Sequence, residues 1–424
     1  MAATLITSCP TSKTTKWFSF VSTEPNNTKL LQPTTQKSIT LDNRIVFPSI
    51  NTYSAKDGCL TDSHLLHYGS LAAHGAGLII IEATAIEACG RTTAYDSGIW
   101  KDEQVEPLKR VVNLIKAQGS VPGIQLSHSG RKLSIVPHLI CSRVTPDEDD
   151  DSPEEKYSAC DLKYTGSDPQ PNELTVTEIR ANVQKWADSA ILANRAGVEV
   201  LEINAANRHL LHYFLSGNLN NRTDFYGGSL QNRMRFPLEV ARAVRAAWPD
   251  EKPLWFRLPA TDFSDSDPLS CDRDGWDIYQ AIEFCKELKK IGIDAIAIAN
   301  GTTTMNIKYP APSTCQAQLA NVIKHEVGIQ TGATGSTCAG EEAEYILQKY
   351  QADYIIVGSG CILKTCFPKK DTPKLLADKI SLSESGSLID SILFVHININ
   401  ISDVGILGCN TVSKKFAHYW DIHS

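Results

Sequence analysis

The stretch TVTEIRANVQKWADSAILANRAGVEVLEIN, residues 175–204, gives the clearest indication of the fold, because it predicts a helix followed at once by a buried strand. Thr175 and Glu178 have the spacing of a capping box, so we expect the helix to begin there. It ends at about Arg195, just before a glycine. The strand Val198–Asn204 contains the apolar residues Val198, Val200, Leu201 and Ile203, and short apolar strands of this kind are typical of burial on both faces of a parallel sheet.

The same alternation of helix and apolar strand extends in both directions from this unit. The strand candidates are Arg44–Ile50, Gly77–Ala83, Val121–Ser127, Val198–Asn204, Leu254–Pro259, Ala295–Asn300, Gly328–Ala333 and Asp353–Gly358. Another clear helix covers Asp274–Ile291, with apolar residues at intervals of three and Gly292 at its end. Strands that are each followed by a helix predict an α/β fold of the (β/α)8 TIM-barrel type. A doubly wound sheet is the alternative.

We expect this barrel to cover residues 30–370, between a flexible N-terminal segment (1–29) and a divergent C-terminal tail (371–424). The composition, 42% hydrophobic and 21% charged over 424 residues, is that of a globular protein. A net charge of −7 argues against nucleic acid or an anionic membrane as partner. No apolar run is long enough to span a membrane, so we expect a soluble, cytoplasmic protein.

The 12 cysteines are scattered without a CxxC pair. They indicate free thiols in a reducing compartment rather than the alternative, a disulfide or zinc framework, and we predict no metal site.

Barrel enzymes place their chemistry at the carboxyl ends of the strands. The polar residues at those ends are Asn51, Tyr53, Glu82, Thr84, Gln125, His128, Asn204, Asn207, Arg208, His209, Arg257 and Asn300. Glycine-rich turns follow the last two strands, at Thr331–Gly335 and Gly358–Gly360. Small residues there let backbone N–H groups approach a phosphate, which favours a phosphorylated ligand near Gly332 and Gly358 over simple turns.

Arg257 and Gln125 are predicted to point into the mouth of the barrel. An interior arginine with no obvious paired acid needs an electron-rich partner. A flavin ring fits, because Arg257 would stabilise negative charge at the N1–C2=O edge and Gln125 would bond the pyrimidine side. The alternative for Arg257 is a structural ion pair.

The segment LSGNLNNRTDFYGGSLQNRMRF, residues 215–236, resembles the signature that follows strand 4 in the Old Yellow Enzyme family. Further similarity extends from about residue 30 to about residue 367. The resemblance implies a TIM barrel that binds FMN and is reduced by NAD(P)H. Its small-molecule substrate would be an activated alkene, an α,β-unsaturated carbonyl compound, in a biosynthetic pathway.

The resemblance also implies site residues. Those expected around FMN are Pro48, Ser49, Ile50, Asn51, Ala83, Gln125, Arg257, Gly358 and Ser359, with Asn300 and Gly332 at neighbouring strand ends. The substrate would face Asn204 and Asn207, with Tyr53 nearby. Ser359 stands where the family has an arginine at the phosphate, so backbone amides would carry most of the phosphate binding. Asn51 replaces a cysteine that this branch often places near the flavin.

The substrate side departs further from the family pattern. The family has His-x-x-His or His-x-x-Asn here and a tyrosine two residues later, whereas this chain has Asn204, Asn207 and His209. Asparagine amides still donate hydrogen bonds to an oxygen but cannot become cationic. His209 can exchange protons near neutral pH, although a surface histidine without a role is equally compatible with the sequence.

Two other functions therefore stay open: a non-redox isomerase or cyclase on the same flavoprotein scaffold, and a catalytically silent binding protein. A homo-oligomer also stays open, because the family's subunit contacts involve a C-terminus that this chain does not match.

Overall fold

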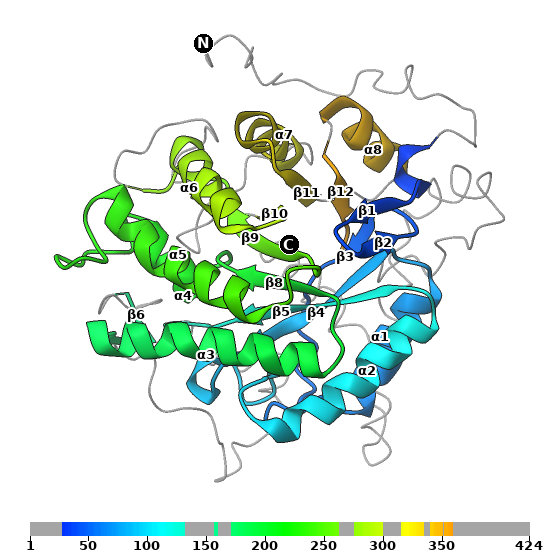
Figure 1. Cartoon of the computed structure of the whole chain (residues 1–424), viewed down its shortest axis with the longest axis horizontal. Coiled ribbons are helices and arrows are strands. Elements are labelled where there is room, and N and C mark those ends of the chain that lie inside the picture. Colours follow the sequence, from blue (N-terminus) through cyan, green and yellow to red (C-terminus); the bar gives the residue numbers. More distant parts are fainter. Residues whose placement is uncertain are drawn as a thin grey trace, which may run out of the picture.

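The computed structural model describes residues 28–131, 157–159, 171–262, 275–299, 315–334, 340–350 and 352–358. Its centre is a closed barrel of parallel strands, shown in Figure 1. In order around the barrel, the strands are β3 (Ile45–Phe47), β4 (Leu78–Ala85), β5 (Val121–Ser127), β8 (Val200–Asn204), β9 (Leu254–Pro259), β10 (Ala295–Ala299), β11 (Gln330–Thr334) and β12 (Tyr354–Ile356). Because β12 pairs with β3, the ring is complete, and the predicted TIM barrel is confirmed.

Helices surround this ring of strands (Figure 1). They are α1 (Asp62–Ala73), α2 (Val105–Ala117), α3 (Val176–Arg195), α4 (Leu210–Leu215), α5 (Leu230–Ala247), α6 (Ile278–Ile291), α7 (Cys315–Val327) and α8 (Gly340–Tyr345). Short helical turns cover Lys29–Leu31, Ala88–Gly90, Asp102–Gln104 and Ile346–Tyr350, and a small parallel pair joins β6 (Tyr157–Ser158) to β7 (Asn172–Glu173). Among the helices of the described residues, none combines the length and the apolarity needed to cross a bilayer.

An N-terminal hairpin closes one end of the barrel. Strands β1 (Thr34–Gln36) and β2 (Ile39–Leu41) form this hairpin, and Leu41 joins the apolar cluster inside the barrel. Gln36 accepts a hydrogen bond of 2.7 Å from the Trp255 indole at the start of β9. Because the amino ends of the strands are covered, the carboxyl ends are left for a ligand.

Helix α3 has the predicted bounds. Thr175 accepts a hydrogen bond from the Glu178 backbone N–H, and Gly197 lies in the left-handed region at φ +85° just after the helix. The predicted start of α6 at Asp274 was wrong, because the Asp277 side chain caps the N–H of Gln280 and the helix begins at Ile278.

The strand predictions were largely correct. The predicted bounds of β5 and β9 are confirmed, whereas the first strand is shorter than predicted and ends before Pro48, which has no N–H for the sheet. Asn300, Ser359 and the tail 371–424 lie outside the described residues, as do residues 1–27 of the predicted N-terminal segment.

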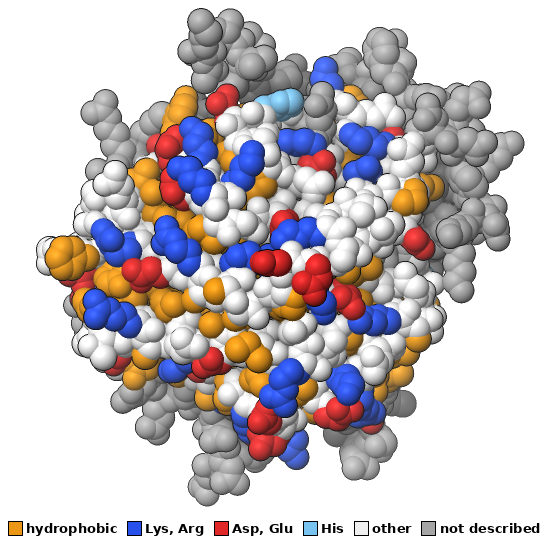
Figure 2. All heavy atoms as spheres, viewed as in Figure 1, with side chains coloured by type: hydrophobic (Ala, Val, Ile, Leu, Met, Phe, Trp, Pro, Cys, Tyr) orange, Lys and Arg blue, Asp and Glu red, His pale blue; other side chains and the backbone are white. Residues whose placement is uncertain are grey.

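Figure 2 shows one face of the molecule. Lysine and arginine side chains alternate there with aspartate and glutamate, so neither sign of charge forms a continuous patch on this face.

Candidate active site

Four polar side chains lie on three adjacent strands near the carboxyl end of the barrel. Gln125 of β5 is directly opposite Glu202 of β8, and Asn204 of β8 is opposite Arg257 of β9. Side chains alternate along a strand, and Val200 and Trp255, two residues before Glu202 and Arg257, belong to the interior cluster. Glu202 and Arg257 therefore also point into the barrel.

Gln125 is fixed by two hydrogen bonds. Its Nε2 donates to Glu202 Oε1 at 2.7 Å, and its Oε1 accepts from the Ser49 hydroxyl at 3.1 Å. Ala83 of β4 is the neighbour of Gln125 on the other side and is partly exposed. The structure thus brings together the predicted flavin residues Ser49, Ala83 and Gln125.

Arg257 has an acidic neighbour that the sequence did not reveal. Burial raises the pKa of the Glu202 carboxyl, and the charge of Arg257 and the hydrogen bond from Gln125 act against this. Burial lowers the pKa of the Arg257 guanidinium, and Glu202 acts in the opposite direction. The prediction that Arg257 has no acid nearby is therefore corrected: Glu202, on the adjacent strand, lies close enough for the two charges to interact.

The guanidinium of Arg257 is not fully satisfied. Arg257 Nη1 is buried and has no hydrogen-bond partner within the described part of the chain. A buried donor without an acceptor is costly, so it marks a place where a ligand acceptor fits. The electron-rich edge of a flavin meets this requirement.

The substrate side contains a chain of hydrogen bonds through Ser127. Asn204 Nδ2 donates to Ser127 Oγ at 3.2 Å, and Ser127 Oγ lies 2.8 Å from His209 Nδ1. Asn204 Oδ1 accepts from the backbone N–H of Ala206 at 3.0 Å, which holds the amide in place. His209 is only 7% exposed, so the surface histidine considered above is contradicted.

The two asparagines predicted to face the substrate lie in different surroundings. Asn204 is 1% exposed, whereas Asn207 is exposed. Asn207 and Arg208 both have left-handed backbone angles, φ +56° and +59°, a region that non-glycine residues seldom adopt. These two residues turn the chain between Asn204 and His209.

A β-bulge in β4 supports the segment that carries Asn51 and Tyr53. The register of β4 against β5 shifts between Ile81 and Ala83, which leaves Glu82 as the extra residue. The Glu82 N–H, without a partner in the sheet, donates to the Tyr68 hydroxyl at 2.8 Å. The Glu82 carboxylate accepts from Thr52 N at 3.0 Å and from the Tyr68 hydroxyl at 3.3 Å, so the bulge holds the chain next to Asn51.

Replacing Tyr68 by phenylalanine should weaken this support. Burial and the nearby Glu82 carboxylate raise the pKa of Tyr68, so the phenol keeps its proton and can donate. Without the hydroxyl, the buried Glu82 N–H loses its acceptor, which should lower the free energy of unfolding by about 1–3 kcal/mol. Urea-induced unfolding measures this change. Tyr279→Phe, at an exposed position on α6, is the matched control, and equal stability of the two variants would contradict the assignment.

The phosphate side depends on two close approaches of glycine. A Cβ on Gly358 would lie 3.0 Å from Ile50 Cδ1 and 3.4 Å from Pro48 Cγ, so glycine lets the end of β12 approach the segment after β3. A Cβ on Gly332 would lie 2.7 Å from Ile356 Cδ1. These contacts place Pro48, Ile50 and Gly358 side by side, as expected for a shared ligand.

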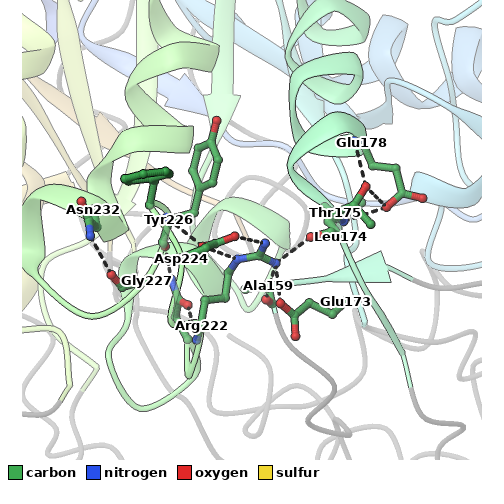
Figure 3. A network of polar contacts seen from close by, with 12 residues as sticks. Ala159, Glu173, Leu174, Thr175, Glu178, Arg222, Asp224, Tyr226, Gly227 and Asn232 are labelled. Carbon is green, nitrogen blue, oxygen red and sulfur yellow. Dashed lines mark hydrogen bonds and ion pairs between the residues drawn. The ribbon is translucent and has the colours of Figure 1, made fainter.

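The loop after β8 is anchored at Arg222, as Figure 3 shows. The Arg222 guanidinium donates to Asp224 Oδ2 at 2.6 Å and to the backbone carbonyls of Ala159 and Leu174 at 3.0 and 2.7 Å. The bond from Arg222 holds the pKa of the Asp224 carboxyl below its usual range. This loop contains the family signature, and the contacts explain why arginine and aspartate occur there.

Replacing Arg222 by methionine should therefore destabilise the protein. Two backbone carbonyls lose their charged donor and Asp224 loses its partner, so we expect the free energy of unfolding to fall by about 2 kcal/mol. Arg110→Met, at an exposed position on α2, removes the same charge without these bonds and should have little effect. A loss for Arg222→Met no larger than that of this control, measured by chemical unfolding, would show that the loop does not depend on the anchor.

A group of three possible metal ligands lies at the end of β5, where ligand atoms of Glu87, Cys89 and His128 fall within 4.8 Å of one another. Other bonds already engage two of these residues. Lys185 and Asn182 donate to the Glu87 carboxylate, and His128 Nδ1 accepts from Gly130 N at 3.0 Å. Burial opposes ionisation of Glu87, but His128 and Lys185 outweigh it and hold its pKa well below the usual range. Glu87 and His128 thus belong to a network of polar contacts with Lys185.

The sequence prediction missed Ser127 and Glu202 as site residues. Glu202 had one available signal, since it is the only acid within an otherwise apolar strand between Val200 and Asn204. Ser127 had none beyond its place at the end of a strand. The sequence contains no local pattern that predicts the bulge at Glu82, because a shift in register depends on how two strands pair.

Comparison with known proteins gives a consistent result. The sequence profile of the NADH:flavin oxidoreductase / NADH oxidase family matches residues 29–374. An NADPH dehydrogenase from Bacillus velezensis is 36% identical over 331 residues, which cover 78% of this chain and 90% of that protein. An NADH:flavin oxidoreductase from Gibberella zeae is 37% identical over 330 residues, which cover 76% and 80% of the two proteins.

The solved structure of morphinone reductase resembles this one with a TM-score of 0.66 at 25% identity, over 85% of this chain and 92% of that chain. The family match spans the barrel and both sides of the site described above. The chain therefore belongs to the NADH:flavin oxidoreductase family of Old Yellow Enzymes.

Proposed function

We propose that this enzyme uses FMN to pass hydride from NAD(P)H to an activated alkene, the carbon–carbon double bond of an α,β-unsaturated carbonyl compound. The observation that carries the proposal is the buried, unpartnered Nη1 of Arg257 beside the fixed Gln125 in the mouth of the barrel. Bound FMN would supply a group that accepts a hydride, which carries two electrons, from NAD(P)H and then passes it on.

The residues that would hold FMN come from three sides of the mouth. Arg257 would face the N1–C2=O edge, where its charge stabilises the reduced form. Gln125 and Ser49 would contact the pyrimidine side, and the segment Pro48–Asn51 with Ala83 would line the ring. The close approach at Gly358 fits a phosphate beside backbone N–H groups.

The substrate carbonyl would be bound by Asn204. A primary amide has two N–H donors, of which Ser127 accepts one, so the other is available to a carbonyl oxygen. A donor to this oxygen stabilises the negative charge that develops there during hydride addition. Asn207, being exposed, would contact the outer part of the substrate, and Tyr53 lies on the segment held by Glu82.

His209 would supply the proton that completes the reduction. Ser127 Oγ accepts from Asn204 and lies within hydrogen-bond distance of His209 Nδ1, which fixes the imidazole ring. In the imidazolium form, the proton on Nε2 would pass to the substrate and leave a neutral imidazole. This histidine replaces the tyrosine that the family resemblance predicts at the same position.

Rapid mixing of the NADPH-reduced enzyme with 2-cyclohexenone tests the proposal. We expect the flavin to be reoxidised and the saturated ketone to form in equal amount. Reduced flavin that persists with cyclohexenone and with a panel of other enones and enals would contradict the proposed substrate class.

The hydrogen-bonded pair Ser127 and His209 also favours a second candidate, a non-redox isomerase or cyclase that works by proton transfer. The two candidates differ in what they consume. Turnover of a substrate by the oxidised enzyme without NADH or NADPH would support the isomerase, whereas strict dependence on the nicotinamide would exclude it.

A further inference from the structure

The least expected charged group inside the barrel is Glu202. We infer that Glu202 is a built-in counter-charge to Arg257 that lowers the reduction potential of the bound flavin and fixes the orientation of Gln125. The inference rests on the proposed FMN site and adds a residue whose role is to set the redox properties of that site.

Glu202 is buried inside the barrel between Gln125 and Arg257. It is 2% exposed, and its side chain points inward from β8 between the strands that carry Gln125 and Arg257. Ionisable groups are rarely buried so completely without a charged or metal partner. Of the described residues, Arg257 is the charged group that acts on Glu202.

The charges of Arg257 and Glu202 have opposite signs and act on the same edge of the flavin. Arginine stays protonated in proteins, so Arg257 brings a permanent positive charge into the barrel. Glu202 is the acid whose charge acts on Arg257. Burial raises the pKa of Glu202, but the Arg257 charge and the hydrogen bond donated by Gln125 favour its ionised form, and in that form it cancels part of the positive field at the flavin edge. Reduced FMN, which is more negative than the oxidised form, is then stabilised less than Arg257 alone would stabilise it.

Glu202 also sets the orientation of the Gln125 amide. An ionised carboxylate only accepts hydrogen bonds, so the Glu202 contact at 2.7 Å requires the amide nitrogen of Gln125. The Gln125 oxygen then faces the Ser49 hydroxyl, as observed. Glu202 therefore determines which atoms of Gln125 are available to the pyrimidine side of a flavin.

The test compares the midpoint potential of FMN in the wild type and in Glu202→Gln. This substitution removes the charge but retains an oxygen that accepts from Gln125. We expect the reduced form to bind about tenfold tighter relative to the oxidised form, which raises the two-electron potential by about 30 mV. Glu283→Gln, at an exposed position on α6, removes the same charge outside the barrel and should leave the potential unchanged.

A second variant, Glu202→Asp, separates charge from geometry. It keeps the negative charge but shortens the side chain, so it should weaken FMN binding, measured by flavin fluorescence, with little change in potential. An unchanged potential in Glu202→Gln would overturn the counter-charge. A rise in potential of equal size in Glu202→Asp and Glu202→Gln would overturn it as well. A wild-type protein that bound no FMN would contradict the proposed function itself, whereas the two outcomes above would contradict only the role of Glu202.

Discussion

Replacing Arg257 by methionine should slow the reduction of the flavin by NAD(P)H about 100-fold. Removal of one well-placed charged donor from a site of this kind typically costs about 10²–10³ in rate. Methionine has a similar length and no charge, so the barrel keeps its packing while the flavin edge loses its cation. Anaerobic stopped-flow measurement of flavin bleaching gives the rate.

The variant has a second expected effect, on Glu202. Burial raises the pKa of this carboxyl and the charge of Arg257 opposes that rise, so removing Arg257 should raise the pKa further. FMN binding should weaken at the same time. Arg242→Met, an exposed arginine on α5, serves as the control and should bleach at the wild-type rate. An Arg257→Met enzyme that binds FMN and bleaches like this control would refute the role of Arg257.

Replacing His209 by asparagine should slow alkene reduction about 100-fold, because general acid catalysis contributes about 10²–10⁴ in rate. Asparagine can still accept a hydrogen bond from Ser127, so the local structure is kept while the proton donor at Nε2 is lost. The reduction of the flavin by NADPH should stay close to the wild-type rate. Stopped flow follows the two half-reactions separately. For this variant, the rate of flavin reoxidation by the alkene should fall while the rate of flavin reduction by NADPH should not change.

His325→Asn, at an exposed position on α7, is the matched histidine control. If His209→Asn reoxidised with cyclohexenone as fast as the wild type, His209 would not be the proton donor. If both half-reactions fell together, the variant would point to a binding or packing role for His209.

The sequence predicted the barrel well because its strands carry a strong local signal. The bounds of β5 and β9 and the capping of α3 follow from runs of apolar residues and from a capping box. The start of α6 was predicted too early, at Asp274, because the apolar spacing continues through Trp276. Trp276 is buried in the preceding loop, where its indole donates to the Pro259 carbonyl, so a tertiary contact imitated the helical pattern.

The site was predicted less completely, because its geometry depends on pairs of strands. Arg257 and Gln125 were found from their positions at strand ends, but Glu202 joins them only through the register of β8 against both neighbours. The bulge at Glu82 arises in the same way. His209 could not be classified as buried from sequence, because the left-handed turn at Asn207 and Arg208 is what brings it to Ser127.

We propose above all that the barrel holds a redox-active flavin beside Arg257 and Gln125. Titration of the purified full-length protein with FMN, followed by anaerobic addition of NADPH or NADH, tests it most directly. We predict a bound flavin with a perturbed absorption spectrum that bleaches when the nicotinamide is added. A colourless protein that leaves the spectrum of added FMN unchanged, or a bound flavin that neither nicotinamide reduces, would contradict it.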